Sequence, residues 1–291
     1  MGTTAHVAVL GGPRGLEHDA AATICELERR WTRFDPGSEL SRLNGAARGR
    51  PTLVSPETYR LVERAVEAWR LTAGRYDPTV LEAVIDSGYD RTFTEIRPDR
   101  RGTGDETLHP APGCEGIELD DRLHAVTLPP GVGIDPGGIG KGFAADLVAA
   151  LVVSQGADGV LVDIGGDIRV MGDGPEDGRW VVDVEDPRNA DRPLLHLALS
   201  DAGIATSSRL RRRWLVDGAE RHHLIDPATG RPTVTPLVAA TVIAGEAWWA
   251  EALTKAVFVA GTLDAAAGAS VVTVDETGAR RATDDLMELI S

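Results

Sequence analysis

Residues 131–146, GVGIDPGGIGKGFAAD, combine residue types that suit the binding of an anionic group. Glycine lacks a β-carbon, so a turn built from it takes positive φ values and lets a ligand approach backbone N–H groups. An apolar run over residues 143–153 predicts a helix whose N-terminal amides face that ligand, and Lys141 adds a full positive charge. The stretch therefore predicts a phosphate-binding loop. Its glycines ahead of Lys141 are Gly131, Gly133, Gly137, Gly138 and Gly140.

The loop does not fit the general nucleotide motifs. It has no GxxxxGK[ST] pattern and no GxGxxG directly after a strand, so a glycine-rich connection that only closes a strand onto a helix stays an alternative. One helix later, Gly165 and Gly166 separate two β-type runs, 160–164 and 168–171, and Asp163 and Asp167 lie on either side of them. Two glycine turns that flank one helix are positioned to face the same ligand.

The elements that must position these turns are strands in runs between a few long helices. Such an order favours an α+β fold with mixed, mostly antiparallel sheets over a doubly wound parallel sheet. We expect one domain over residues 1–291, or two lobes of about 1–130 and 131–291. Beyond the runs named above, helices are predicted at 16–34, 56–72, 246–260 and 263–267, and strands at 5–10, 180–184, 194–199, 213–215, 237–243 and 270–274.

Three further segments complete this outline. Residues 117–128 predict a hairpin with Asp120, Asp121 and Arg122 at its turn. Residues 34–44 are predicted as a loop, and residues 97–113, polar and rich in glycine and proline, as a mobile insertion or exposed loop.

Several motifs resemble those of the ApbE family of FAD:protein FMN transferases, in the family's order and over nearly the whole chain. Residues 134–146 and the GGD at 165–167 resemble the family's DxGGIAKGYAxD and GGD. The other matching stretches are MGT (1–3), SELSRLN (38–44), GRYDPTV (74–80), IATSS (204–208), HLIDPATGRP (223–232) and AEALTKAVFVAG (250–261).

The resemblance implies an ApbE-like fold with an FAD cleft between two lobes. It also implies an enzyme that cleaves FAD and attaches FMN to a Ser or Thr hydroxyl of an acceptor protein, with release of AMP. Phe34 and Tyr76, two of the chain's few aromatic residues, then line the flavin or adenine pocket; the structural alternative is that they cover a helix end and a loop. The implied FAD-binding positions are Met1, Phe34, Tyr76, Asp77, Asp135, Gly137, Gly138, Lys141 and Ile225.

The same resemblance places His223 and Asp226 beside the scissile diphosphate, with Lys141 on the phosphates. A histidine that titrates near neutrality accepts a proton from a hydroxyl, and a carboxylate orients it or binds a cation. Either His223 or Asp226 is therefore the base. If the segment is extended, His222 faces the opposite way, so only one of the two histidines is expected to be catalytic. The alternative is a surface histidine pair with Asp226 starting a turn.

The family's Mg²⁺ site is altered in this chain. The resemblance implies an aspartate and, four residues on, a threonine as ligands, with the Gly140 carbonyl completing the site; here those side chains are Glu251 and Lys255. A protonated amine cannot ligate a metal, and Glu251 and Lys255 also suit a simple helical ion pair. Thr254 points about 100° away around the helix and is a poor substitute.

Three outcomes follow for the Mg²⁺ site. They are a weakened site at Glu251, Asp226 and Gly140, a metal-free site in which the Lys255 ammonium replaces the cation, and loss of transfer. The alternative functions are accordingly an FAD-binding relative without transferase activity and an FAD diphosphatase that yields FMN and AMP.

Composition limits the partners. A formal net charge of −15 argues against nucleic acid and anionic membranes, which repel a diffuse negative field. The arginines at 209 and 211–213 are expected in a solvated loop.

Cys25 and Cys114 show no metal-type spacing and are expected to be two unrelated thiols. Without a signal peptide or an apolar run long enough to span a bilayer, the expected location is cytoplasmic, unless an export leader has been removed ahead of residue 1.

Overall fold

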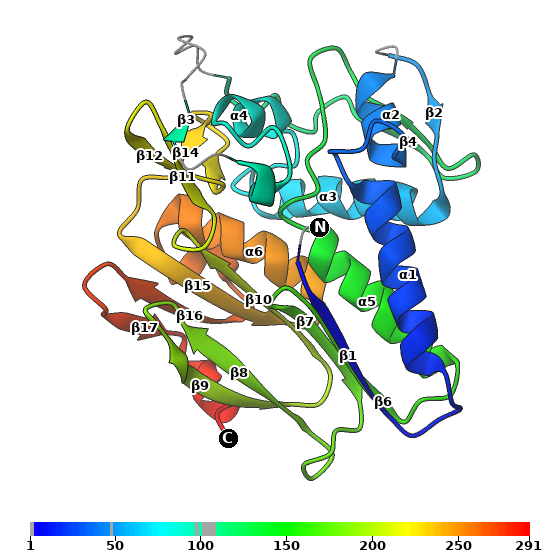
Figure 1. The fold of residues 1–291 in the computed structure, drawn as a ribbon, viewed down its shortest axis with the longest axis vertical. Coiled ribbons are helices and arrows are strands. Elements are labelled where there is room, and N and C mark those ends of the chain that lie inside the picture. Colours follow the sequence, from blue (N-terminus) through cyan, green and yellow to red (C-terminus); the bar gives the residue numbers. More distant parts are fainter. Residues whose placement is uncertain (1–2, 47–48, 97–98, 101–108) are drawn as a thin grey trace. The chain divides into compact units, whose positions relative to one another are not determined.

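The computed structural model describes residues 3–46, 49–96, 99–100 and 109–291 (Figure 1). These residues form two compact units, and each unit is assembled from separated segments of the chain. Unit 1 is formed by residues 27–140 and 209–234, and unit 2 by residues 3–26, 141–208 and 235–291. The chain passes from one unit to the other inside α1 (Leu16–Trp31) and at the first residue of α5 (Gly140–Ser154).

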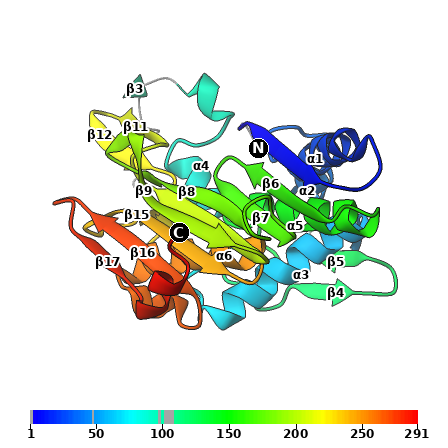
Figure 2. The same cartoon turned by 90° about the horizontal axis from the view of Figure 1, so that it is seen from below.

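Unit 2 is built on a seven-stranded sheet in which all neighbouring strands are antiparallel. Helix α6 (Ala247–Ala260) packs on β10 and β15, and the hairpin of β8 (Trp180–Asp186) and β9 (Asn189–Leu199) lies toward the other side of the sheet (Figure 2). Short 3₁₀ helices occupy Leu263–Ala266 and Asp284–Glu288. In order across the sheet, the strands are β1 (Ala5–Leu10), β6 (Gly159–Ile164), β7 (Asp167–Gly172), β10 (Ala202–Ser208), β15 (Leu237–Ala244), β16 (Ser270–Asp275) and β17 (Arg280–Ala282).

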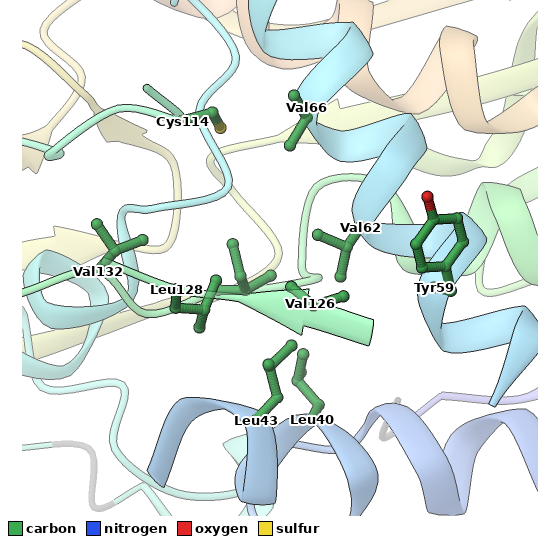
Figure 3. Close-up of a cluster of buried hydrophobic side chains, with 10 residues drawn as sticks. Leu40, Leu43, Tyr59, Val62, Val66, Cys114, Val126, Leu128 and Val132 are labelled. Atoms are coloured by element: carbon green, nitrogen blue, oxygen red, sulfur yellow. The ribbon is translucent and has the colours of Figure 1, made fainter. Parts of the chain in front are cut away.

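Unit 1 combines three small sheets with short helices. Its hydrophobic core lies between α2 (Glu39–Gly45), α3 (Pro56–Leu71) and β5, where Leu40, Leu43, Val62 and Val126 meet (Figure 3). The remaining helices are α4 (Leu81–Asp86) and the 3₁₀ turn Phe93–Glu95. The sheets are β2 (Thr52–Leu53) with β5 (Ala125–Thr127) and β4 (Glu118–Asp120), β12 (Ala219–His222) with β11 (Arg213–Val216) and β3 (Asp99–Arg100), and β13 (Ile225–Asp226) with β14 (Arg231–Pro232).

This architecture confirms the predicted α+β class with mostly antiparallel sheets. The predicted hairpin at 117–128 is present as β4 and β5, which pair antiparallel. The Ser55 side chain accepts a hydrogen bond from the Thr58 N–H and caps α3, as its position before a proline predicted. Strand β10 was not predicted, although it lies at the centre of the sheet, because its small residues carry no alternation of apolar and polar types.

Two helix boundaries differ from the prediction. Helix α1 ends at Trp31 rather than near residue 34, because the Thr32 hydroxyl accepts from the Phe34 N–H and the Thr32 carbonyl accepts from Ser38. The predicted loop at 34–44 contains α2, whose N-cap Ser38 accepts from the Ser41 N–H at 2.9 Å. The first part of the predicted loop was correct, but this part precedes a helix. Of the predicted loop at 97–113, residues 97–98 and 101–108 lie outside the described residues.

The predicted glycine conformations are only partly correct. In the loop, Gly131 has a φ of 85°, whereas Gly133, Gly137, Gly138 and Gly140 have no positive φ, so left-handed backbone is not the reason for these four glycines. The second pair does behave as expected. Gly165 and Gly166 have φ of 65° and 89°, and they form the two-residue turn that joins β6 to β7.

Both cysteines are free thiols, Cys25 exposed and Cys114 buried, as expected. Burial raises the pKa of the Cys114 thiol well above its usual range. Among the described residues, no helix has the length and apolar character needed to cross a bilayer.

Candidate functional site

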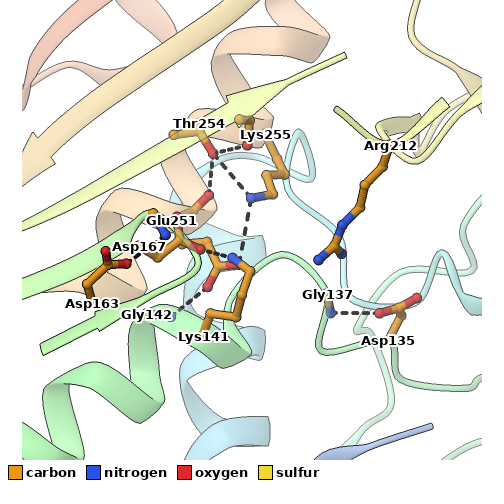
Figure 4. A network of polar contacts seen from close by, with 12 residues as sticks. Asp135, Gly137, Lys141, Gly142, Asp163, Asp167, Arg212, Glu251, Thr254 and Lys255 are labelled. Atoms are coloured by element: carbon orange, nitrogen blue, oxygen red, sulfur yellow. Dashed lines mark hydrogen bonds and ion pairs between the residues drawn. The ribbon is translucent and has the colours of Figure 1, made fainter. Parts of the chain in front are cut away.

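A buried cluster of charged side chains forms where α5 and α6 meet in unit 2. We call it the lysine cluster, and it consists of Lys141, Gly142, Asp167, Glu251 and Lys255 (Figure 4). The Glu251 side chain is fully buried. Lys141 Nζ lies 2.9 Å from Glu251 Oε1, and the Gly142 N–H donates to Oε2 at 2.8 Å. Lys141 also forms an ion pair with buried Asp167, and Lys255 Nζ lies 3.8 Å from Glu251 Oε1.

The local sequence explains how these groups converge. Helix α5 starts at Gly140, three residues earlier than predicted, so Lys141 and Gly142 stand in its first turn. A β-carbon at Gly142 would collide with the Ala247 carbonyl and lie 2.8 Å from the Trp248 nitrogen. Glycine at position 142 therefore permits the close approach of α5 to the start of α6, which brings Glu251 within reach of Lys141.

Opposing effects act on the Glu251 carboxyl. Burial raises its pKa, but the Lys141 and Lys255 ammonium groups and the Gly142 N–H lower it further than burial raises it, so the pKa lies below its ordinary value. Glu251 is therefore an anion at neutral pH. The two lysines balance it together with Asp167, which is 1% exposed.

Two residues that sequence reasoning did not single out hold α6 in place. Both carboxylate oxygens of Asp146 accept backbone hydrogen bonds at the helix start, from Ala247 at 2.9 Å and from Trp248 at 2.8 Å. Arg169 Nε lies 3.3 Å from Asp146. Burial raises the pKa of Asp146 to about 7. Asp146 was visible in the sequence, but the two backbone N–H groups that it binds lie 101 and 102 positions away in the chain.

The predicted amide cradle at 137–142 is already partly occupied by the protein itself. The Gly137 N–H donates to Asp135 Oδ1 at 2.6 Å, and the Ile139 and Gly140 N–H groups donate to the Pro136 carbonyl. The Gly142 N–H is held by Glu251. Only part of this backbone is thus available to a ligand, and Lys141 carries the main positive charge.

Unit 1 contains a second polar cluster, which we call the arginine cluster: Arg33, Phe34, Tyr89 and Asp135. The Arg33 guanidinium lies over the rings of Phe34 and Tyr89, 4.3 and 4.7 Å from their centroids, and its Nε is 3.3 Å from Asp135 Oδ2. Arg33 also donates to the Tyr89 carbonyl at 2.6 Å. Phe34 is 37% exposed, so its ring is accessible, as expected for a residue outside the core.

Tyr76 and Asp77 differ from Phe34 because both are buried. Asp77 accepts from the Thr79 N–H and hydroxyl at 2.8 and 2.6 Å, and burial raises its pKa against those hydrogen bonds. Tyr76 is only 3% exposed, so it belongs to the buried interior of unit 1. Met1 lies outside the described residues.

The two adjacent histidines of unit 1 differ as predicted. His222 ends β12 and is buried, and burial lowers its pKa, so it is neutral near pH 7. His223 is partly exposed, and its Nδ1 lies 3.4 Å from the Arg212 carbonyl. A carbonyl only accepts, so a hydrogen bond at this contact requires the proton on Nδ1 of His223.

Asp226 and Ile225 shape the turn that follows. Asp226 Oδ1 accepts from the Ala228 N–H at 3.0 Å, and the Asp226 carbonyl accepts from Gly230, so the aspartate does start a turn. Ile225 is buried against Ala83 and Val84. In the arginine run at 209 and 211–213, Arg212 donates to the Tyr89 hydroxyl and Arg213 pairs with Glu220, so these two are not merely solvated.

The residues described do not fit a divalent cation. No three histidine, cysteine, aspartate or glutamate side chains in the described part of the chain are grouped to hold a metal ion. Both oxygens of Glu251 are hydrogen-bonded, and Lys255 places a positive charge next to them. The Thr254 hydroxyl is buried and is bonded to Ser207 Oγ and the Glu251 carbonyl, both at 2.7 Å, so it does not replace the missing threonine ligand.

The chain is similar over most of its length to known proteins. The chain is 32% identical over 270 residues to the FAD:protein FMN transferase of Vibrio cholerae, which covers 90% of this chain and 79% of that protein. The Treponema pallidum FAD:protein FMN transferase is 31% identical over 243 residues, 77% of this chain and 65% of that protein. The crystal structure of the Thermotoga maritima ApbE protein superposes with a TM-score of 0.85 at 30% identity and covers 99% of this chain and 96% of that one.

The solved structure of the flavin transferase ApbE from Vibrio cholerae superposes with a TM-score of 0.79 at 26% identity, again over 99% of this chain and 96% of that one. The family model of ApbE matches residues 1–274. With sequence and fold in agreement over almost the full length, this chain belongs to the ApbE family.

Proposed function

We propose that this protein is an FAD:protein FMN transferase that attaches FMN to a Ser or Thr hydroxyl of an acceptor protein and releases AMP. The observation that carries the proposal is Lys141, which stands in the first turn of α5 between two buried carboxylates. Helix N-termini and ammonium groups both attract phosphate. The similarity to proteins named FAD:protein FMN transferase supports the choice of FAD among phosphate-bearing ligands.

In this proposal, His223 is the general base. Its Nδ1 lies 3.4 Å from the Arg212 carbonyl, which suits a proton on Nδ1 and a basic Nε2, whereas the Asp226 carboxylate accepts a hydrogen bond within its own turn. Nε2 takes the proton of the acceptor hydroxyl, and the hydroxyl oxygen bonds to the phosphorus on the FMN side. The bond from that phosphorus to the bridging oxygen breaks, and AMP leaves with the bridging oxygen.

The remaining residues are assigned to binding. Phe34, which is 37% exposed, is assigned to contact with flavin or adenine, and Asp135 with Gly137 and Gly138 is assigned to the phosphates. Tyr76, Asp77 and Ile225, which are buried, and Met1 keep the FAD-binding role that the family resemblance implies for their positions. A cytoplasmic location is part of the same proposal, and cell fractionation tests it.

The test is transfer to a protein acceptor. The purified chain is incubated with FAD and an acceptor protein that carries a flavinylation Ser or Thr, with Mg²⁺ in one arm and chelator in another. A covalent fluorescent acceptor band with stoichiometric AMP is expected. His223→Asn should reduce the rate about 100-fold, within the usual range for general bases, while the matched change at exposed His18, His18→Asn, should leave it unchanged. Neither adduct nor AMP in any arm would refute the proposal.

The altered metal position favours one competing function. Lys255 in place of threonine suits a relative that binds FAD without transferring FMN, and the same assay recognises it by tight FAD binding with no AMP. An FAD diphosphatase would instead release FMN and AMP when acceptor is omitted.

A further inference from the structure

Lysine is rare in this chain. Its 30 lysines and arginines include only two lysines, Lys141 and Lys255, and every other basic residue of this kind is arginine. These two lysines are 114 positions apart in the sequence, yet both ammonium groups lie at Oε1 of Glu251, at 2.9 and 3.8 Å. Both lysines of the chain therefore place a compact positive charge beside the same carboxylate.

The charges of the lysine cluster balance without a metal ion. Lys141 and Lys255 carry two positive charges, and Asp167 and Glu251 carry two negative ones (Figure 4). A divalent cation ligated by Glu251 would lie about 2 Å from its oxygen and therefore close to the Lys255 ammonium, which repels it. With threonine at position 255 the cluster would carry one net negative charge, which favours a cation. The lysine removes that preference.

Lys255 is also placed to reach a ligand. Its side chain is 18% exposed, whereas Glu251 is fully buried beneath it, so the ammonium lies at the accessible side of the cluster. Nζ donates to the Thr254 hydroxyl at 3.3 Å. An ammonium group only donates hydrogen bonds, so a phosphate oxygen is a matched acceptor for it.

We propose that the Lys255 ammonium takes over the role of the divalent cation, so that this protein binds the diphosphate of its ligand through Lys141 and Lys255 and needs no Mg²⁺. Lys255 stays protonated throughout. It offsets charge on the phosphate oxygens while the bond to the bridging oxygen breaks, and it exchanges no proton with the substrate. The transfer part of this inference rests on the proposed function, whereas the diphosphate-binding part does not.

The scarcity of lysine makes a direct test possible. Reductive methylation with carbon-13 formaldehyde labels only Lys141, Lys255 and the N-terminal amine and keeps their positive charges. NMR signals are assigned with Lys141→Arg and Lys255→Arg. Inorganic pyrophosphate and FAD should each shift the Lys255 signal in the presence of chelator, and millimolar Mg²⁺ alone should leave it in place. A Lys255 signal unmoved by both ligands, or moved by Mg²⁺ alone, would overturn the inference.

Variants test the same point by affinity and rate. FAD affinity and AMP release by the native protein should be equal in chelator and in Mg²⁺. Lys255→Met should weaken FAD binding about tenfold to 100-fold, as expected for one hydrogen bond to a charged group, and Mg²⁺ should not rescue it. Lys255→Thr should show the same loss in chelator and regain affinity with Mg²⁺. Arg14→Met removes an exposed positive charge and controls for net charge, while circular dichroism checks folding.

The outcomes separate the two proposals. Chelator-sensitive FAD binding by the native protein, or native affinity in Lys255→Met, contradicts the role of Lys255 even if transfer occurs. Metal-independent FAD binding that depends on Lys255, with no adduct and no AMP, supports that role while refuting the transferase.

Discussion

Two buried carboxylates, one in each unit, hold basic side chains in different ways. In the lysine cluster, Glu251 is surrounded by two ammonium groups and a backbone amide. In the arginine cluster, Asp135 meets a single guanidinium, that of Arg33, which also lies over two aromatic rings. Each carboxylate in addition accepts the N–H of a loop glycine, Gly142 for Glu251 and Gly137 for Asp135.

The difference follows from the shapes of the two cations. Guanidinium is planar and weakly hydrated, so it stacks on Phe34 and Tyr89 while it faces a carboxylate with its edge. Ammonium is a compact point charge, and two of them fit around one carboxylate where a flat group has no space. The arginine cluster is thus a structural brace, whereas the lysine cluster gathers two ammonium groups around one carboxylate.

The largest effect should come from removing the charge of Glu251. Glu251→Gln leaves two ammonium groups beside a neutral amide with only Asp167 to balance them, so we expect the free energy of unfolding to fall by about 3–5 kcal/mol. Urea denaturation measures it. Glu57→Gln is the control, because it breaks the half-exposed Arg30–Glu57 pair, and it should change the free energy by less than about 1 kcal/mol. Equal losses in the two variants would contradict the charge argument.

The unfolding free energy that Glu251→Gln loses should depend on pH, and the pKa of Glu251 determines in which direction. The pKa of Glu251 is lower in the folded protein than its ordinary value, so its ionised form stabilises the fold at pH values above the ordinary pKa. This stabilisation decreases as the pH falls below that value toward the lowered pKa. The difference in unfolding free energy between the native protein and Glu251→Gln should therefore be constant near neutrality and shrink on acidification. A difference that grows on acidification would show that the folded pKa is raised.

Adding a β-carbon to Gly142 and to Gly137 should reveal a further difference between the two clusters, in the stability that each variant loses. Gly142→Ala forces backbone atoms of α6 away, and overpacking of this kind costs about 3 kcal/mol. At Gly137 the β-carbon would lie 2.8 Å from Asp135 Oδ1, the end of a side chain that can rotate, so Gly137→Ala should cost about 1 kcal/mol. Thermal denaturation of both variants measures the difference, and a larger loss at Gly137 would contradict it.

The sequence predicted the parts of this comparison but not their pairing. Lys141 was identified from a local signal, a lysine that follows glycines, whereas Glu251 and Lys255 were identified because the family resemblance places metal ligands at their positions. The close approach of α5 to α6 was not predictable, since Gly142 was interpreted through its backbone freedom rather than through the missing β-carbon. Arg33 and Tyr89 were missed for a similar reason, because their contact joins residues 56 positions apart.

The fold shows the same difference between local patterns, which the sequence reveals, and long-range contacts, which it does not. Helix α3, the β4–β5 hairpin and most strands of the large sheet carry local patterns and were predicted, whereas β10 is recognisable only by its two neighbours, β7 and β15. Helix α2 was not predicted because the residues just before it suit either a turn within a loop or the N-cap of a helix. Only the burial of Leu40 and Leu43 shows that a helix follows.

The smallest expected effect tests the arginine cluster alone. Arg33→Lys keeps the charge beside Asp135 but removes the planar group from the rings of Phe34 and Tyr89, so the free energy of unfolding should fall by about 1 kcal/mol. Urea denaturation measures this, and Arg33→Met gives the added cost of leaving Asp135 without its cation. If the free energy of unfolding falls equally in Arg33→Lys and Arg33→Met, the ion pair with Asp135 contributes nothing beyond stacking. If Arg33→Lys loses nothing, the two clusters do not differ in their need for a particular cation, and the brace is an ordinary ion pair.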